Sequence, residues 1–365
     1  MKKTLIALAA LATTAAFAQS SVSITGRVDM GLVNTKTTNT NLADVSTSTT
    51  VTDLTGNQNG RTTSRLTFSG VEDLGGGMSA RFNIETGLNP SDDAALFSGS
   101  TRNGSLSLVT GVGAFSIGTF TSNGIDAVRG LSAATFSVGG GDFLANTASG
   151  AQFNALLTAI GAPTLPAGVT LGMSGRSRNA VAYSGAFGPV SVSLGLHSQK
   201  NVAATTKTSG SIIGLGYVDG PITARLAIGN AKSSNSVTGT LNGKNSDVVV
   251  GGSYNLGMAV PYAVYETVKL TVPGGNIKAD AFEVGARFPM GALTPYVLVA
   301  TGNHKADGDK IAKSTGFQLG TTYDLSKRTY LYTAVGQDKV KGVDDGPVGA
   351  SSKRNSFIAG LVHQF

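Results

Sequence analysis

Arginines are the residues of this 365-residue chain whose type and spacing could do chemistry. Arg27, Arg81, Arg225 and Arg287 each lie in a segment where apolar and polar residues alternate, and each falls on the polar side. A guanidinium group stays protonated at any relevant pH and binds anions through a rigid fork of donors. Several such groups on one polar surface would create a standing positive potential, so the spacing predicts a surface that attracts anions.

Other charged residues fall on the same polar side of their segments. The further arginines with this parity are Arg65, Arg176 and Arg178. The acids with this parity are Asp29, Glu85 and Glu283, and the side of Glu266 is ambiguous. Arginines outnumber acids, which favours anion preference. The alternative is that the arginines pair with neighbouring carboxylates and only stabilise the structure on whose surface they lie.

Residue types that most enzymes use are scarce. The chain has no Cys, which excludes a disulfide framework, a thiol nucleophile and a cysteine-ligated metal. No acid matches the position of His197, His304 is expected in a polar loop and His363 lies near the C-terminus, so we interpret the histidines as solvated or interfacial. The chain contains no Gly-x-Ser-x-Gly elbow and no phosphate loop between a strand and a helix. We therefore expect no enzyme, no metal and no cofactor, and, because the basic residues are dispersed, no nucleic-acid partner.

Strands must position these side chains, because an alternation of period two runs through most of the chain. Successive side chains of a strand point to opposite faces, so each segment has one apolar and one polar face. Sixteen strands are predicted, over residues 21–34, 61–72, 77–88, 102–110, 113–121, 176–187, 189–199, 210–219, 221–231, 246–256, 259–269, 278–289, 292–302, 314–325, 328–338 and 353–365.

The connections between these strands alternate in length. Seven are short and contain turn residues, as at 73–77 and 187–189, and eight are longer and polar, as at 35–60. An even strand number with turns at one rim and loops at the other indicates an all-β, 16-stranded antiparallel transmembrane β-barrel, with short periplasmic turns and long extracellular loops. A β-sandwich is the alternative, but its core would have to bury the charged faces.

The first 18 residues have the pattern of a secretory signal. A basic start is followed by an apolar run, and Ala16, Phe17 and Ala18 form a cleavage pattern. We expect residues 1–18 to be a signal peptide cleaved after Ala18, and residues 19–365 to be the barrel.

Several short motifs occur in the order found in one known family. Residues 64–77 read SRLTFSGVEDLGGG, residues 179–183 read NAVAY, residues 326–332 read SKRTYLY, and the chain ends in Phe365. Through these motifs the chain resembles the Gram-negative general diffusion porins of the betaproteobacterial, anion-selective type. The resemblance implies homotrimers in the outer membrane of a Gram-negative bacterium, surrounded by lipid and lipopolysaccharide. It implies a water-filled pore for small anions and other small hydrophilic solutes, and a Phe365 that the barrel-assembly machinery reads.

The resemblance also implies that the third loop, residues 122–175, folds into the barrel and constricts it. Matching motif positions make Arg65, Arg102 and Arg178 the candidate constriction residues, with Asp126 of the loop facing them. The alternation of the strand points Arg102 outward unless the strand begins with a bulge. A substrate-specific outer-membrane channel and a barrel adhesin are the alternatives to a general pore.

Overall fold

The computed structural model describes residues 21–56, 62–91, 97–121, 123–133, 143–144, 151–159, 176–201, 206–235 and 241–365. The predicted signal peptide lies outside these residues. The strands are β1 (Ser21–Thr40), β2 (Ser46–Thr55), β3 (Arg65–Gly75), β4 (Met78–Leu88), β5 (Phe97–Thr110), β6 (Gly113–Thr121), β7 (Arg176–Phe187), β8 (Val190–Asn201), β9 (Thr206–Asp219), β10 (Ile222–Asn235), β11 (Leu241–Tyr254), β12 (Val260–Val272), β13 (Gly275–Arg287), β14 (Leu293–Ala306), β15 (Asp309–Asp324), β16 (Thr329–Gly342) and β17 (Ser351–Gln364).

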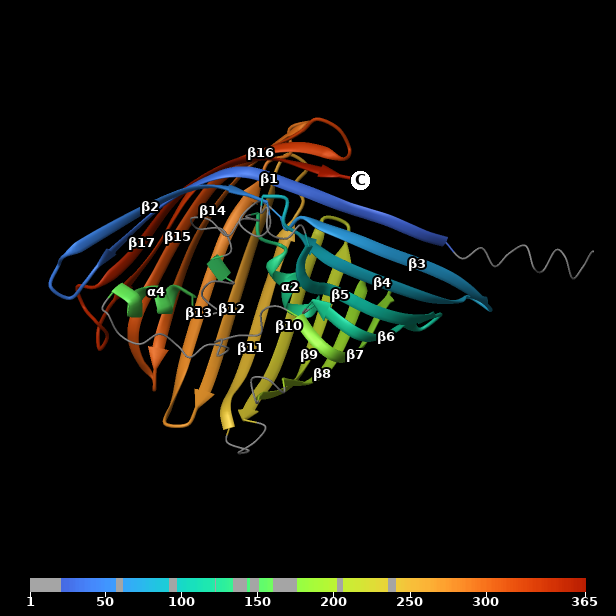
Figure 1. Cartoon of the computed structure of the whole chain (residues 1–365), viewed down its shortest axis with the longest axis horizontal. Coiled ribbons are helices and arrows are strands. Elements are labelled where there is room, and N and C mark those ends of the chain that lie inside the picture. The colour runs from blue at the N-terminus through green and yellow to red at the C-terminus, as the bar shows by residue number, and fades with distance from the viewer. Residues whose placement is uncertain are drawn as a thin grey trace, which may run out of the picture.

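These strands form one closed antiparallel sheet (Figure 1). From β3 to β17 each strand pairs with the next, and β1 closes the ring by pairing with β17 along residues 27–40 and with β3 along residues 21–27. β2 pairs with β1 along residues 31–40, so β2 and β3 lie one after the other beside β1. The ring therefore has sixteen strand positions, and the predicted 16-stranded barrel is confirmed.

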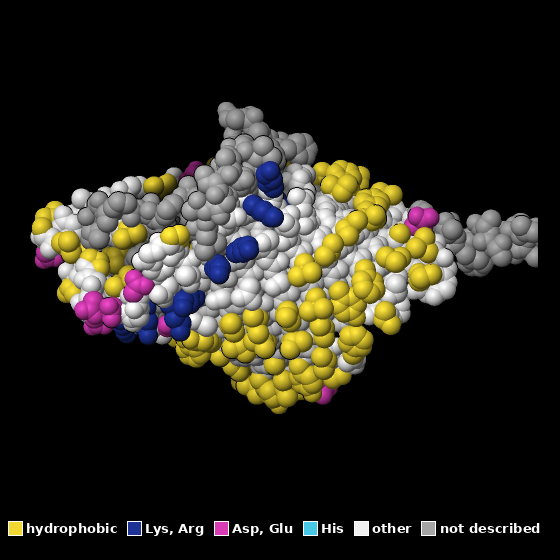
Figure 2. Space-filling view, turned by 90° about the horizontal axis from the view of Figure 1, so that it is seen from below, with side chains coloured by type: hydrophobic (Ala, Val, Ile, Leu, Met, Phe, Trp, Pro, Cys, Tyr) yellow, Lys and Arg dark blue, Asp and Glu magenta, His cyan; other side chains and the backbone are white. Residues whose placement is uncertain are grey.

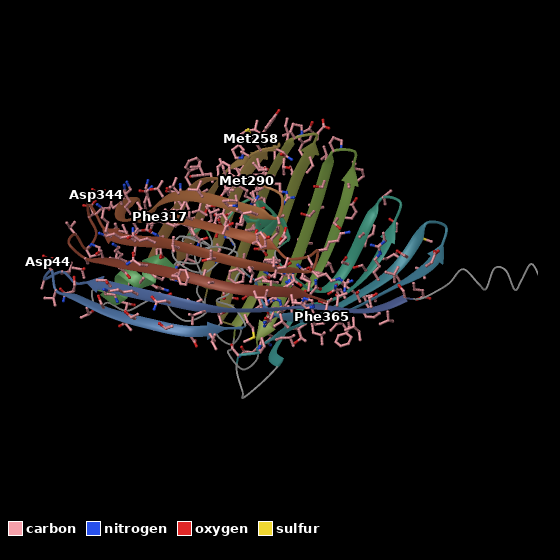
Figure 3. All side chains as sticks on the ribbon, turned by 90° about the horizontal axis from the view of Figure 1, so that it is seen from above. Asp44, Met258, Met290, Phe317, Asp344 and Phe365 are labelled. Carbon is pink, nitrogen blue, oxygen red and sulfur yellow. The ribbon has the colours of Figure 1, made fainter. Side chains whose placement is uncertain are left out.

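The two rims of the barrel differ, as predicted. Met258 and Met290 lie in short turns at one rim, and Asp44 and Asp344 lie in connections at the other rim (Figure 3). We call these rims the turn end and the loop end. The N-terminal end of β1 and the C-terminal Phe365 both lie at the turn end, where Gly26 and Phe365 exchange two backbone hydrogen bonds.

Strands extend further toward the loop end than the alternation predicted. Residues 35–60 were expected to be a loop, but β1 continues to Thr40 and β2 returns beside it. Threonine favours strands because its branched side chain suits the pleated surface, and facing hydroxyls bond across the hairpin, as Thr38 and Ser48 do at 2.8 Å. Similar extension reduces the β12–β13 and β14–β15 connections to tight turns, in which Gly274 and Gly308 have φ of 95° and 106°.

The described parts of the third loop, residues 123–133, 143–144 and 151–159, lie inside the barrel. Its helices α2 (Asn123–Arg129) and α4 (Ala151–Ala159) contact opposite parts of the wall: α2 packs on β8–β11, and α4 on β16, β17 and β1. Loop residues including Ile125 and Phe143 are fully buried. The wall makes room for them with small residues, because a Cβ at Gly316 would stand 2.7 Å from the Phe143 ring. The prediction of an inward-folded third loop is thus confirmed.

Large apolar side chains cover the outer face of the barrel, where Ile24 and Val299 are more than half exposed. Figure 2 shows them as a broad band across the visible face of the wall. The buried apolar side chains instead lie mainly where the third loop meets the wall. Among the described residues, no helix is long and apolar enough to cross a bilayer.

Candidate functional site

An arginine group lies on the inner face near β1, β3 and β5. Glu85 of β4 accepts a hydrogen bond from Arg102 Nε at 2.8 Å and forms an ion pair with Arg65, whose Nε lies 3.3 Å from the carboxylate. Arg27 is the cross-strand partner of Arg65 and donates to Thr62 Oγ1 at 2.7 Å. One carboxylate shared between two arginines leaves a positive surplus at this place.

A bulge brings Arg102 into this group. In the β4–β5 ladder, Asn103 pairs with Glu85 and Thr101 pairs with Thr86, so Arg102 is the extra residue. Because a bulge shifts the alternation by one position, the Arg102 side chain lies on the same face as Glu85. The expectation that Arg102 points inward only if its strand begins with a bulge therefore describes the structure.

Arginines of β7 extend the positive region. The charges of Arg102, Arg178, Glu85 and Asp126 all act on Arg176. A second bulge lies here, because the β6–β7 register shifts between Gly118 and Phe120. Asp126 is exposed on α2, whereas its neighbour Ile125 is buried against the wall. The charge of Asp126 acts on Arg176, so the Asp126 carboxylate lies within electrostatic reach of the β7 arginines.

Arg81 is separate from this group. It lies four residues closer to the turn end of β4 than Glu85, which is about 13 Å along a strand. Its side chain is exposed on the inner face.

Three carboxylates on the opposite wall hold the third loop. Arg129 at the end of α2 donates to Glu266 of β12, with one contact at 3.0 Å, and lies 3.6 Å from Asp247 of β11. Burial alone would lower the pKa of Arg129, but the charge of Glu266, the hydrogen bond to it and the charges of Asp247 and Asp126 together outweigh burial, so the pKa is raised. Glu283 of β13 accepts from the Ser132 hydroxyl, and from Tyr262 at 2.8 Å. Glu266 and Asp247 thus balance the charge of Arg129, and all three acids hold this part of the loop against the barrel wall.

Arg225 and Arg287 also hold the loop. Arg225 donates to the Ala127 carbonyl at 2.6 Å, and Arg287 donates to the carbonyls of Leu131, at 3.0 Å, and Ser132. The last carbonyls of a helix have no partner within the helix, so these arginines satisfy acceptors at and beyond the end of α2. They lie on β10 and β13, away from the Arg65–Glu85–Arg102 group.

Sequence reasoning did not predict that Arg129 holds the third loop on the barrel wall through Asp247 and Glu266. The alternation of Asp247 with Val248 and Val250 was a signal that could have placed its side chain inside.

The expected position of His304 in a polar loop is wrong, because β14 extends past it and its ring is buried beside Ser314. Within the described ranges no group of three or more His, Asp or Glu side chains could hold a metal ion.

A closed barrel that is apolar outside, charged inside and crossed by an inner loop defines the class of outer-membrane channels. The chain belongs to the Gram-negative porin family, whose model matches residues 4–343. It is 30% identical to outer membrane porin protein 32 of Delftia acidovorans over 384 residues, covering 100% of both chains.

Solved structures share this fold. The anion-selective porin from Comamonas acidovorans superposes with a TM-score of 0.68 at 24% identity, covering 95% of this chain and 100% of the other. OmpT of Vibrio cholerae, in its trimer form, gives a TM-score of 0.65 at 17% identity over 95% and 99%. The protein is accordingly an outer-membrane porin, and its relatives are channels.

Proposed function

We propose that this porin passes small hydrophilic solutes by passive diffusion and prefers anions. The observation that carries the proposal is the arginine group in which Arg65 and Arg102 share Glu85, with Arg27, Arg176 and Arg178 close by. Low-dielectric walls focus the field of such a group, and rings of arginine favour anion passage. The name of the Comamonas relative, an anion-selective porin, supports the same preference.

Pairing with Glu85 does not remove this preference. Five arginines of the group act near three carboxylates, those of Glu85, Asp29 and Asp126. Asp29 is buried and accepts a hydrogen bond from Tyr332, so its negative charge lies within the barrel wall and does not face the water of the pore. The charge that remains toward water is positive.

The zero-current potential of the purified protein in a planar bilayer under a KCl gradient tests the proposal. We expect a potential with the sign of chloride preference, reduced in Arg65→Ser and in Arg178→Ser. Arg328→Ser is the matched control, because Arg328 is exposed in a short turn and should leave the potential unchanged. Cation preference in the wild type would refute the arginine mechanism while the porin function stood.

The proposal includes partners and excludes catalysis. We infer a homotrimer, which the trimer form of the Vibrio relative supports, and contact with outer-membrane lipid and lipopolysaccharide. We infer recognition of Phe365 by the barrel-assembly machinery; this residue is 44% exposed at the seam between β1 and β17. We infer no enzymatic activity, no cofactor and no nucleic-acid partner.

A further inference from the structure

Lysines occupy the outer face of the barrel, and only part of its circumference. Thirteen of the fourteen lysines after residue 18 lie toward the loop end of β1 and β8–β17. This lysine belt consists of Lys36, Lys200, Lys207, Lys232, Lys244, Lys269, Lys278, Lys305, Lys310, Lys313, Lys339, Lys341 and Lys353. Strand parity gives the direction: Lys269 alternates with buried Val268 and Leu270 and shares the face of the exposed Tyr265.

The belt follows the edge of the apolar band. On nine of the eleven strands, four residues separate the lysine from a large apolar outward side chain, as from Leu196 to Lys200 and from Phe357 to Lys353. Four residues rise about 13 Å along a strand, or about 10 Å along the barrel axis at a tilt of about 40°. The headgroup layer begins at the edge of the hydrocarbon and adds about 5–8 Å on each side. A lysine Cα about 10 Å beyond the last apolar side chain lies just outside this layer, and the flexible stem can carry the ammonium back to headgroup level. Figure 2 shows basic side chains in a row beyond the apolar band.

Neighbouring strands bring these like charges face to face. Lys232 pairs with Lys244, Lys269 with Lys278, and Lys278 with Lys305; Lys200 and Lys207, Lys313 and Lys341, and Lys339 and Lys353 do the same. Like charges directly opposite each other destabilise a sheet.

Among the described residues, no salt bridge involves a lysine of the belt. All five salt bridges in the described part of the chain use arginine. Asp280, an acid on the same outward face, accepts a hydrogen bond from Asn303 at 2.9 Å. The belt is thus a row of positive charges that face one another at headgroup level, and an external polyanion can bind to it.

We propose that the lysine belt binds the phosphate groups of lipopolysaccharide in the outer leaflet. The inference rests on the proposed lipid partner and assigns it a site. A lysine ammonium is a compact charge on a flexible stem, so it can follow phosphates in a fluid layer, and two facing lysines can share one phosphate. Because no lysine occurs between residues 37 and 199, the sector β2–β7 has no such site and is left for contact between subunits.

Binding of bisphosphorylated lipid A to the purified full-length protein tests the site. In the variant Lys232→Gln/Lys244→Gln/Lys269→Gln/Lys278→Gln, we expect binding to weaken by about fivefold per lysine at low salt, and so by at least about a hundredfold. Dephosphorylated lipid A should bind wild type and variant equally weakly. The matched control is Lys327→Gln/Arg328→Gln at the turn end, which should bind as the wild type does.

Two further measurements keep the outcome decisive. Channel conductance in a phospholipid bilayer should be unchanged in the quadruple variant, so a loss of channels would report on the porin function and not on the belt. The corresponding quadruple Lys→Arg variant keeps the charge and should keep the binding if the Gln variant fails to fold. Equal affinity of the wild type and the Gln variant for bisphosphorylated lipid A, or equal affinity of the wild type for both lipids, would overturn the proposal.

Discussion

Replacing Arg129 by Met should release the third loop from the barrel wall. The substitution keeps a long apolar stem and removes the guanidinium that lies between Glu266 and Asp247, whose side chains are 1% and 0% exposed. Removing one partner of a buried ion pair costs about 3–5 kcal/mol, because the remaining charge stays buried without compensation. At about 1.4 kcal/mol per factor of ten, the equilibrium between the docked and undocked loop should shift by roughly 100- to 4,000-fold.

Hydrogen exchange gives the direct readout of this shift. Amides of residues 123–133 should exchange at least about a hundredfold faster in Arg129→Met, while those of β14–β16 stay unchanged, and single-channel currents should become noisier. Arg354→Met is the matched control, because it breaks a more exposed ion pair, with Asp338, that does not involve residues 123–133. Unchanged exchange in residues 123–133 would refute the view that this ion pair holds the loop.

Three further changes have defined outcomes. Glu85→Gln removes the carboxylate that two lumen arginines share, so the zero-current potential should move further toward chloride preference; movement toward potassium would contradict the electrostatic argument. Gly26→Val should lower the yield of heat-modifiable barrel on gels, because a Cβ at Gly26 would stand 2.6 Å from Phe365 Cζ; a normal yield would mean that the ring moves freely. Tyr332→Phe removes a 2.6 Å hydrogen bond to buried Asp29 and should lower the free energy of unfolding in urea by about 1–3 kcal/mol; an unchanged midpoint would count against this bond.

Alternation predicted which way most strand residues point, because a lipid-facing strand must keep one apolar face. Arg27 and Glu85 could be placed inside on this ground alone, and their contacts lie there. The same rule was insufficient at Arg102, where one extra residue in the strand reverses the direction of the side chain. A bulge leaves no signal in the period-two pattern except a break, which can also mark the end of a strand.

Contacts between distant segments were beyond sequence reasoning. Arg225 and Arg287 have the parity of lumen residues, but their partners are backbone carbonyls of a loop about 100 or more residues earlier in the chain. Any residue type offers a carbonyl, so no motif announces such a pair. The hairpin of β1 and β2 was missed for a different reason: its two faces are both polar, and the apolar signal that identifies a membrane strand stops at the edge of the lipid.

The separation of lysine from arginine divides the reactive chemistry of the surface. Acylating reagents modify primary amines, and dicarbonyl reagents modify guanidines. Apart from Lys327, every lysine after residue 18 lies on the outer wall, whereas Arg65 and Arg102 line the inner one. The two reagent classes therefore address opposite sides of one wall, so the outside of the barrel can carry a label or a tether while the conducting path keeps its native charge.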